Sequence, residues 1–296
     1  MTVPSESIPP VRRLGPGDLR RCTALAVDRE WSPEEAKWAL LLAVSEVFGV
    51  DAPDGAGLAG AVVLTRWAAD YAAVGMMLVA ARYERRGLGR ALLEHLLRAA
   101  GDDATVTLFA TDMGRPLYEK LGFAPVRRSV SFIGRFRPSP APDNSKKRGA
   151  PVRPATEGDL PAILALDRAA FGADRGPVLT RLWGLADQVA VLEAAGTAGP
   201  GIAGYGAAWR NEPDSTVIGP LVAPDGAAAR RIVAALAAQA GTTVRLDLDP
   251  DRPELPGWAD ARGLTPAART VVMARGPLPP RGIPAQLYTP ISVALA

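Results

Sequence analysis

The sequence repeats itself with a single period, and this repetition restricts the folds open to the chain more than any local motif does. Residues 11–19 contain Val-Arg followed by Gly-Asp-Leu, and the same residue types return 141 positions later in residues 152–160. Residues 118–123 return at the same spacing as residues 259–264, with a glycine in register. A two-copy repeat of this length is typical of one fold present twice in tandem.

The repeat divides the chain into two domains joined by a linker. Residues 138–151 are rich in proline and contain a Lys-Lys-Arg run, a composition typical of linkers. We therefore expect a first domain at residues 1–137, the linker at 138–151 and a second domain at 152–296. A chain of 296 residues, 48% of them hydrophobic, is long and apolar enough to give each domain a core.

Composition excludes several classes of function. With one cysteine, Cys22, and one histidine, His95, the chain lacks the residues for an internal disulfide or a multi-thiolate metal site. We expect Cys22 to be a core residue and His95 an ordinary helix residue. The net charge of +3 is too small an excess to indicate nucleic-acid binding. Membrane-length apolar runs and a signal peptide are not evident, so we expect a cytoplasmic protein with no metal, nucleic acid or membrane partner.

A strand, a basic glycine-containing loop and a helix follow one another in the first domain. The apolar run 72–80 predicts a buried strand, residues 85–90 (Arg-Arg-Gly-Leu-Gly-Arg) form the loop, and residues 91–100 have helical periodicity. This layout directs backbone N–H groups and the helix dipole at an anion. A Walker A loop is excluded by Arg90-Ala91, and a dinucleotide fingerprint by Leu92. The pattern therefore predicts a phosphate or pyrophosphate cradle.

Periodicity predicts a mixed α/β fold around this loop. Further strands are expected at 11–14, 47–50, 59–66, 105–110 and 124–136. Further helices are expected at 19–28, with Asp18 as N-cap, at 33–43, with Ser32 as N-cap, and around Tyr118. The proline-rich tail 276–296 is expected to lie along a domain surface.

Two of these segments resemble the GNAT superfamily of N-acetyltransferases. The loop positions that match the family's acyl-CoA loop are Val79, Arg86, Gly87, Gly89 and Ala91. Two positions depart from it, because Ala81 replaces a usual proline and Glu84 a usual glutamine or arginine. Residues 118–123 (Tyr-Glu-Lys-Leu-Gly-Phe) resemble a second family segment, at the expected distance from the loop.

The resemblance implies the fold and the reaction. Each domain should be α/β (α+β), with a mixed, mostly antiparallel central sheet flanked by helices. The first domain should bind acetyl-CoA and transfer its acetyl group directly to an amine. The implied cofactor-binding residues are Leu78, Val79, Arg85, Arg86, Gly87, Leu88, Gly89, Arg90, Thr111 and Gly114. Tyr118 is implied as the general acid that protonates the departing thiolate. For the general base, Asp28, Glu30, Asp112 and a water chain stay open.

The acceptor is less constrained by the sequence. In the family it lies beside the first two helices, where the implied lining residues are Glu30, Trp31, Glu34 and Trp38. Carboxylates and aromatic faces suit a cationic amine, but the two tryptophans fit helix packing equally well. We expect a small-molecule amine, such as a metabolite or natural product. A protein amine as acceptor, a non-catalytic acyl-CoA sensor or scaffold, and a homodimer are left open.

The second copy lacks the chemical groups of the first. In place of the basic loop it has residues 224–228, in which Asp225 puts a carboxylate where an anion would bind. Ala259 stands at the position of Tyr118 and cannot donate a proton. Residues 152–296 therefore resemble the degenerate C-terminal half of a tandem bacterial GNAT protein.

Overall fold

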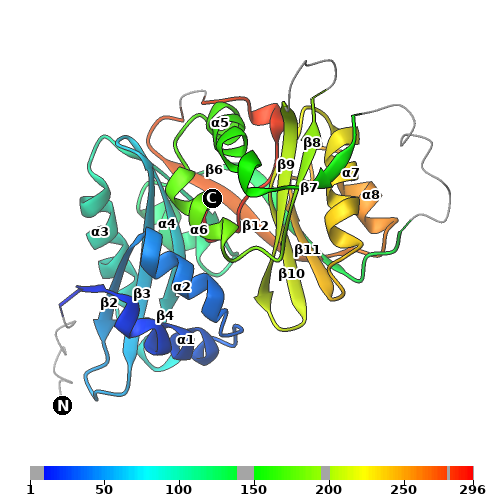
Figure 1. Ribbon diagram of the computed structural model, residues 1–296. Coiled ribbons are helices and arrows are strands. Elements are labelled where there is room, and N and C mark those ends of the chain that lie inside the picture. The colour runs from blue at the N-terminus through cyan, green and yellow to red at the C-terminus, as the bar shows by residue number, and fades with distance from the viewer. Residues whose placement is uncertain (1–9, 139–149, 195–200, 279–280, 296) are drawn as a thin grey trace, which may run out of the picture. The chain divides into compact units, whose positions relative to one another are not determined.

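The computed structural model describes residues 10–138, 150–194, 201–278 and 281–295. Most of the expected linker, residues 139–149, lies outside the described residues. The chain forms two compact units, Met1–Val106 and Thr107–Ala296, and each is an α/β unit (Figure 1). The boundary falls within β5 (Thr105–Ala110).

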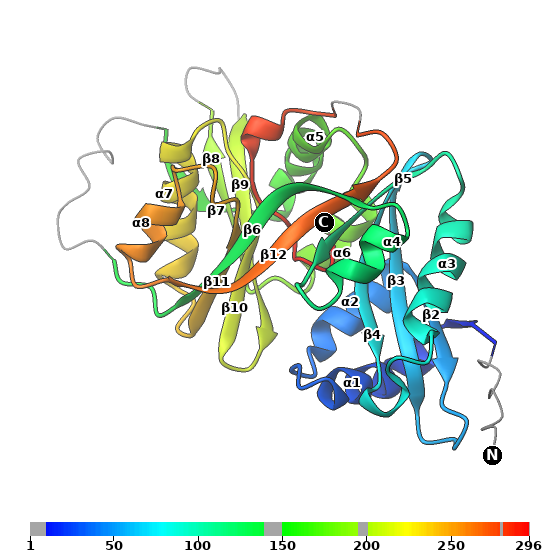
Figure 2. The ribbon, with the colours of Figure 1, turned by 180° about the vertical axis from the view of Figure 1, so that it is seen from behind.

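The first unit contains an antiparallel run of four strands, β1-β2-β3-β4. Its elements are β1 (Arg12–Leu14), α1 (Leu19–Asp28), α2 (Glu35–Val44), β2 (Glu46–Asp51), β3 (Leu58–Ala68), β4 (Tyr71–Val79) and α3 (Leu88–Ala100). Figures 1 and 2 show α1 and α2 against one face of these strands and α3 against the other. The expected strands and helices of residues 11–100 are therefore present.

Helix α3 packs closely on β3 because its leucines recur at helical spacing. Leu88, Leu92 and Leu96 are among its buried residues and recur every four positions, which places them on one face. Gly60 on β3 lies under this face. A Cβ atom at Gly60 would stand 2.8 Å from Cδ1 of Leu92, so glycine allows the helix that carries the basic loop to approach the sheet.

The expected start of α2 is wrong by two residues. The sequence places Ser32 as N-cap and Pro33 in the first turn, whereas the helix begins at Glu35. The preceding residues are held in a turn, because the N–H of Trp31 donates to the carbonyl of Ala26 at 3.0 Å and Glu34 has a φ of 44°. The chain reverses direction after α1, and the non-helical conformation of Glu34 delays the start of α2 to Glu35.

The second unit contains a longer sheet, in the order β12-β6-β11-β10-β9-β8-β7, with β13 also paired to β10. Its strands are β6 (Ala124–Gly134), β7 (Val152–Pro154), β8 (Gln188–Glu193), β9 (Ile202–Glu212), β10 (Ser215–Val222), β11 (Thr243–Leu248), β12 (Thr265–Arg275) and β13 (Leu287–Thr289). Its helices are α4 (Arg115–Lys120), α5 (Leu160–Phe171), α6 (Gly176–Trp183), α7 (Gly226–Ala237) and α8 (Pro256–Asp260). Among the pairings described in this unit, β10–β11 is parallel and the others are antiparallel. The mixed, mostly antiparallel sheet expected from the sequence is confirmed.

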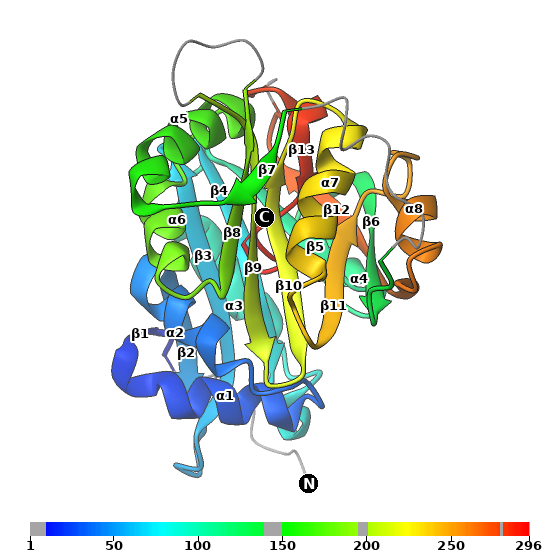
Figure 3. The ribbon, with the colours of Figure 1, turned by 45° about the vertical axis from the view of Figure 1, so that its right-hand side comes forward.

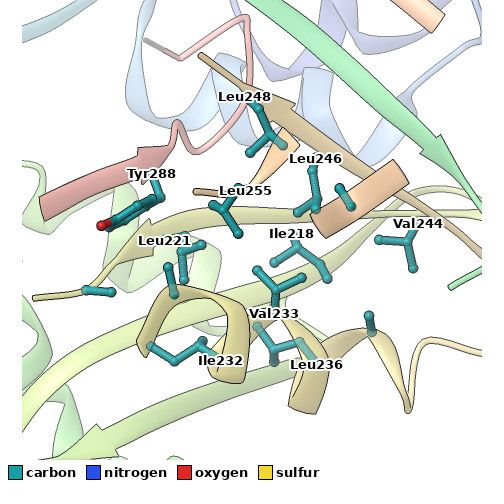
Figure 4. Packing of buried hydrophobic residues seen from close by; sticks show 14 of the residues in the cluster. Ile218, Leu221, Ile232, Val233, Leu236, Val244, Leu246, Leu248, Leu255 and Tyr288 are labelled. Carbon is teal, nitrogen blue, oxygen red and sulfur yellow. The ribbon is translucent and has the colours of Figure 1, made fainter. Parts of the chain in front are cut away.

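Alternation along the strands fills two cores, one on each face of this sheet. Leu221 belongs to the cluster beneath α7, which Figure 4 shows with Ile218, Val233 and Leu246. Its neighbour Val222 belongs to the opposite cluster, which contains Ile163 of α5. Figure 3 shows β7 to β11 side by side, with α7 across one face. A strand buried on both faces explains why residues 217–222 of β10 carry no polar side chain.

An arginine–aspartate pair recurs in both units and confirms the repeat at the level of side chains. Arg12 donates two hydrogen bonds to Asp18, at 3.1 and 2.7 Å, and Arg153 donates two to Asp159, both at 2.8 Å. Each arginine also reaches a carboxylate of a neighbouring strand, Asp51 in the first unit and Glu193 in the second. Asp18 thus serves this pair and does not cap α1 with its side chain.

Strand β6 comes from the first sequence repeat but lies inside the sheet of the second unit. It pairs antiparallel with β11 over Val130–Gly134 and with β12 along almost its whole length. The bounds 1–137 and 152–296 therefore describe the sequence repeat, whereas β6 belongs to the second compact unit. The domain bounds stay a proposal.

Candidate active site

The basic loop leads into the N-terminus of α3, as the sequence predicts. Gly87 occupies the N-cap position with a φ of 82°, and Ala91 makes the first helical hydrogen bond to its carbonyl, at 3.0 Å. Among the described residues, no side chain caps this end of α3. The N–H groups of Leu88, Gly89 and Arg90 precede that first bond, so they point out of the helix end. This arrangement favours an anion.

Arginine side chains surround this helix end and are exposed. Arg85 takes a left-handed conformation, with a φ of 59°, and both Arg85 and Arg86 are solvent-exposed. Arg82 and Arg86 lie over the ring of Tyr83, with guanidinium carbons 4.9 and 5.6 Å from its centroid. Arg90 pairs with Glu94 one turn along α3. The loop therefore presents several cations within one short segment.

The end of α1 holds this loop through two contacts that the sequence analysis did not predict. The carboxylate of Asp28 accepts a hydrogen bond from the backbone N–H of Ala81 at 2.7 Å. The next residue, Arg29, pairs with Glu84 at 2.6 Å. Ala81 and Glu84 are the two positions at which the loop departs from the family pattern. A proline at position 81 has no N–H to donate, so the first contact requires the departure.

Strand β4 directs one specific amide toward the side of the strand that β3 does not occupy. Ala80 donates its N–H to Ala59 of β3 at 2.9 Å. Because successive residues of an antiparallel pair alternate in direction, the N–H of Val79 points to the opposite edge of β4. Leu78, opposite Ala61, points its N–H toward β3. Of the two implied pantetheine contacts, Val79 therefore has the amide directed away from β3.

Tyr118 lies in α4 of the second unit, in a tight and mostly apolar setting. It is buried, and burial raises the pKa of its phenol to about 12. Its ring packs edge-on against Phe123, with centroids 6.0 Å apart. A Cβ atom at Gly114 would stand 3.0 Å from the Tyr118 ring, and Thr111 accepts the Gly114 N–H at 3.2 Å. Thr111 and Gly114 thus shape the space that the phenol occupies.

The residues implied for the acceptor site fall into two groups. Glu30 and Trp31 are exposed, Trp31 with 42% of its surface accessible. Glu34 is buried and paired with Lys37, and Trp38 is completely buried. Trp38 therefore packs in the core, which is the alternative that the sequence left open. All three carboxylates considered as base, Asp28, Glu30 and Asp112, are exposed, and Asp28 is also bonded to the loop.

The single cysteine and histidine play structural parts. Cys22 has no accessible surface, and burial raises the pKa of its thiol to about 12, so a reactive thiolate is not expected there. His95 packs edge-on against Phe48, with ring centroids 4.8 Å apart. Within the described ranges, no group of three metal-ligating side chains is present, and no helix is long and apolar enough to span a membrane.

The second copy retains the backbone of the site without its side chains. The N–H of Phe123 donates to the backbone carbonyl of Tyr118 at 3.1 Å, and the N–H of Leu264 donates to the backbone carbonyl of Ala259 at 3.0 Å in the same manner. At the end of the β10 strand, Asp225 caps α7 by accepting the N–H of Ala228 at 2.8 Å. The anion expected at this helix end is therefore supplied by the chain itself.

Comparison with known protein families identifies the same fold in both halves. Two family profiles described as "Acetyltransferase (GNAT) domain" match the chain, one at residues 45–125 and the other at residues 163–289. The protein described as "Uncharacterized N-acetyltransferase YitH" of Bacillus subtilis is 29% identical over 182 residues. That alignment covers 62% of this chain and 62% of the relative, so the chain spans less than two thirds of that relative's length.

Solved structures resemble almost the whole chain. A Pyrococcus horikoshii protein with a proposed acetyltransferase assignment covers 97% of this chain and 95% of its own, with a TM-score of 0.78 at 20% identity. A GCN5-related N-acetyltransferase from Sphaerobacter thermophilus covers 92% and 97%, with a TM-score of 0.62 at 19% identity. A tandem GNAT protein from the clavulanic acid biosynthesis pathway covers 91% and 99%, with a TM-score of 0.64 at 16% identity. These similarities show the fold.

Proposed function

Because this chain belongs to the GNAT superfamily of acetyltransferases, we propose that it is an acetyl-CoA-dependent N-acetyltransferase. Residues of the first sequence repeat carry the reaction, and the second repeat carries none of it. The acceptor is the amine of a small molecule. The product is an acetylated amine and free CoA.

The observation that carries this proposal is the contrast between two helix ends. At α3 the first-turn N–H groups are free of a side-chain cap within the described chain, and exposed arginines surround them. At α7 a carboxylate from the chain fills the equivalent position. An uncapped helix end with added cations suits the pyrophosphate of acetyl-CoA. The amide of Val79, at the end of the strand before the loop, supplies a donor for the acyl-pantetheine part.

The reaction that follows is a direct transfer. The amine nitrogen attacks the thioester carbon, the carbon–sulfur bond breaks, and the hydroxyl of Tyr118 gives its proton to the departing sulfur. The raised pKa keeps this phenol protonated throughout the neutral range, so a donor is present when sulfur leaves. The attacking amine loses a proton to water or to an exposed carboxylate, for which Glu30 is the candidate near α1.

Exposed residues after α1 favour a cationic acceptor. Trp31 offers an accessible aromatic face and Glu30 a neighbouring carboxylate, which is the combination that binds ammonium groups. Glu34 and Trp38 support this segment from the core and do not contact the acceptor.

Calorimetry and a thiol-release assay test the proposal together. Acetyl-CoA should bind to the purified chain, and free thiol should appear when small amines are added. Arg85→Ala and Arg86→Ala should each weaken acetyl-CoA binding about tenfold, the value of one charge-assisted contact. Arg98→Ala, at the other end of α3, is the matched control and should leave affinity unchanged. Binding without turnover on any amine would favour the sensor, and no binding at all would reject the proposal.

A further inference from the structure

The edge of β10 that faces β11 is shared between two strands. On its other edge, β9 pairs with β10 from Ser215 to Val222. The parallel partner β11 pairs only with the first part, Ser215–Val217. The C-terminal strand β13 pairs with the last part, at Leu221 and Val222. Because β9 occupies one edge throughout, β13 must take the place that β11 leaves on the other.

This place corresponds to the proposed acyl-CoA edge of β4. Both strand pairs contain one extra residue at equivalent points, because the register moves from Val63↔Gly75 to Ala61↔Leu78 in the first unit. In the second unit it moves from Ala208↔Ile218 to Gly206↔Leu221. Aligned on these β-bulges, Leu221 stands at the position of Leu78 and Val222 at that of Val79, so Ala223 follows one residue after the position of Val79.

The amide one residue beyond that position already has a partner on this edge of β10 in the second unit. Ala223 donates its N–H to the carbonyl of Gln286, at 3.0 Å, just before β13. In the first unit Val79, whose N–H also points away from the preceding strand, is the amide proposed to bind the acyl-pantetheine part of the cofactor. At the neighbouring helix end, the Asp225 carboxylate accepts a hydrogen bond from the first turn of α7. The free edge of β10 and the N-terminal end of α7 are thus both occupied by groups of the protein itself.

We propose that the C-terminal segment, residues 286–289, occupies the acyl-CoA groove of the second domain, and that Asp225 stands in for the phosphates. The proposal rests on the proposed acyl-CoA site at Val79, since that site defines the equivalent groove. A domain filled in this way does not bind acetyl-CoA. The whole chain therefore takes up one acetyl-CoA, in the first domain.

The side chain of Arg252 binds the C-terminal segment through hydrogen bonds to its backbone. Its guanidinium donates to the carbonyls of Leu287 at 2.7 Å, Ala285 at 2.8 Å and Pro284 at 3.4 Å, and it lies 4.2 Å from the centre of the Tyr288 ring. Tyr288 is a member of the hydrophobic cluster beneath α7, which Figure 4 shows. The chain beyond β13 is also inside, with Ile291 and Leu295 fully buried. The expectation that the tail lies along a surface holds for residues 282–285, which are exposed, and is wrong for residues 288–295, most of which are buried.

Close packing against β10 explains a glycine in that strand. A Cβ atom at Gly219 would stand 2.1 Å from the carbonyl oxygen of Pro290. Any larger residue at position 219 would require the strand or the tail to shift. The glycine thus allows the tail to lie close to β10, where β13 pairs with the edge that β11 leaves open.

Hydrogen exchange resolved to single amides tests the proposal on the full, unmodified chain. Without ligand, the amide of Ala223 should exchange slowly, and it should not change when acetyl-CoA is added. The amide of Val79 should gain protection on adding acetyl-CoA. Rapid exchange at Ala223 in the free protein, or protection that appears there only with acetyl-CoA, would overturn the filled groove. A Val79 amide that never responds would instead count against the proposed function, and leave the Ala223 result intact.

Two variants test the contact of Arg252 with the tail, and the binding stoichiometry tests the number of acetyl-CoA sites. Arg252→Ala should speed exchange at Ala223 about tenfold or more, because three acceptors on the tail lose their donor. Arg262→Ala is the matched control, since Arg262 also lies over an aromatic ring, that of Trp258, but has no hydrogen bond to the described residues of the tail. Calorimetry on the wild type should give one acetyl-CoA per chain. Two equivalent sites, or equal exchange at Ala223 in both variants, would contradict the assignment.

Discussion

The carboxylate of Asp28, at the end of α1, accepts a hydrogen bond of 2.7 Å from the backbone N–H of Ala81, the second residue after β4. The contact ties the first helix to the start of the basic loop. It gives Asp28 a positioning role, since the carboxylate is bonded to the loop and need not contact substrate. The same residue was a candidate base from sequence.

Asp28→Ala should therefore raise the KM for acetyl-CoA with a smaller effect on kcat. A hydrogen bond to a charged acceptor contributes about 1.5–3 kcal/mol, so a loss of about tenfold in affinity is expected. Asp28→Asn keeps an oxygen that can accept the Ala81 N–H, and it should restore most of the affinity. Steady-state kinetics with varied acetyl-CoA separates the two constants. If the asparagine variant instead loses kcat as severely as alanine, Asp28 acts as a base.

The neighbouring pair, Arg29 and Glu84, should couple weakly to cofactor affinity. Arg29 is largely buried but Glu84 is about a third exposed, so the pair should be worth no more than about 1 kcal/mol. A double-mutant cycle of Arg29→Ala and Glu84→Ala, read out as Kd for acetyl-CoA, measures that coupling. The exposed pair Arg90 and Glu94 provides a comparison on the same loop and helix. Additive losses at the first pair would show that Arg29 does not hold the loop.

Local patterns predicted the elements that carry the loop but not the contacts that hold it. The bounds of α1 and the strand before the loop follow from apolar periodicity, which is a short-range signal. Asp28 and Ala81 are 53 positions apart, and nothing in either segment indicates that they meet. The tail was misjudged for a related reason. Its prolines indicate an irregular chain, and β13 is only three residues long, so its burial depends on an edge left open by β11.

The internal repeat was the sequence feature that predicted relationships between residues far apart in the chain. It predicted the paired units, and Arg153 with Asp159 repeats the contact of Arg12 with Asp18. It did not predict that β6 would join β11 and β12, because strand partners are chosen by tertiary packing and not by order along the chain.

Replacing the proposed acid tests the step at which sulfur leaves. Tyr118→Phe keeps the ring that packs on Phe123 and removes only the hydroxyl. Acetyl-CoA binding should persist while kcat falls by about 10²–10⁴, the range for loss of a general acid. Calorimetry and the thiol-release assay report the two quantities separately. Full activity in this variant would remove Tyr118 from the mechanism and leave the loop assignment untouched.

The same residue should titrate abnormally. Burial favours the neutral phenol, and the pKa of Tyr118 rises from 10.0 to about 12. Its contribution to stability is complete below about pH 10, the unfolded value, and is lost as pH rises toward 12. Relative to Tyr118→Phe, the wild type should lose about 1.4 kcal/mol of unfolding free energy per pH unit in that interval. Denaturant titrations of both proteins measure this difference, and parallel pH curves would contradict it.

A buried ion pair in the second unit should dominate the stability of that unit. Arg175 donates to Asp167 at 3.0 and 2.6 Å, Tyr205 donates to the same carboxylate, and all three residues are almost fully buried. Asp167→Ala leaves the Arg175 charge without this partner in a dry site, so a loss of about 3–5 kcal/mol is expected. Glu119→Ala, which breaks the exposed pair with Arg115, should cost less than about 1 kcal/mol. Thermal unfolding followed by circular dichroism compares the two variants, and similar shifts in Tm would show that the buried pair carries no special weight.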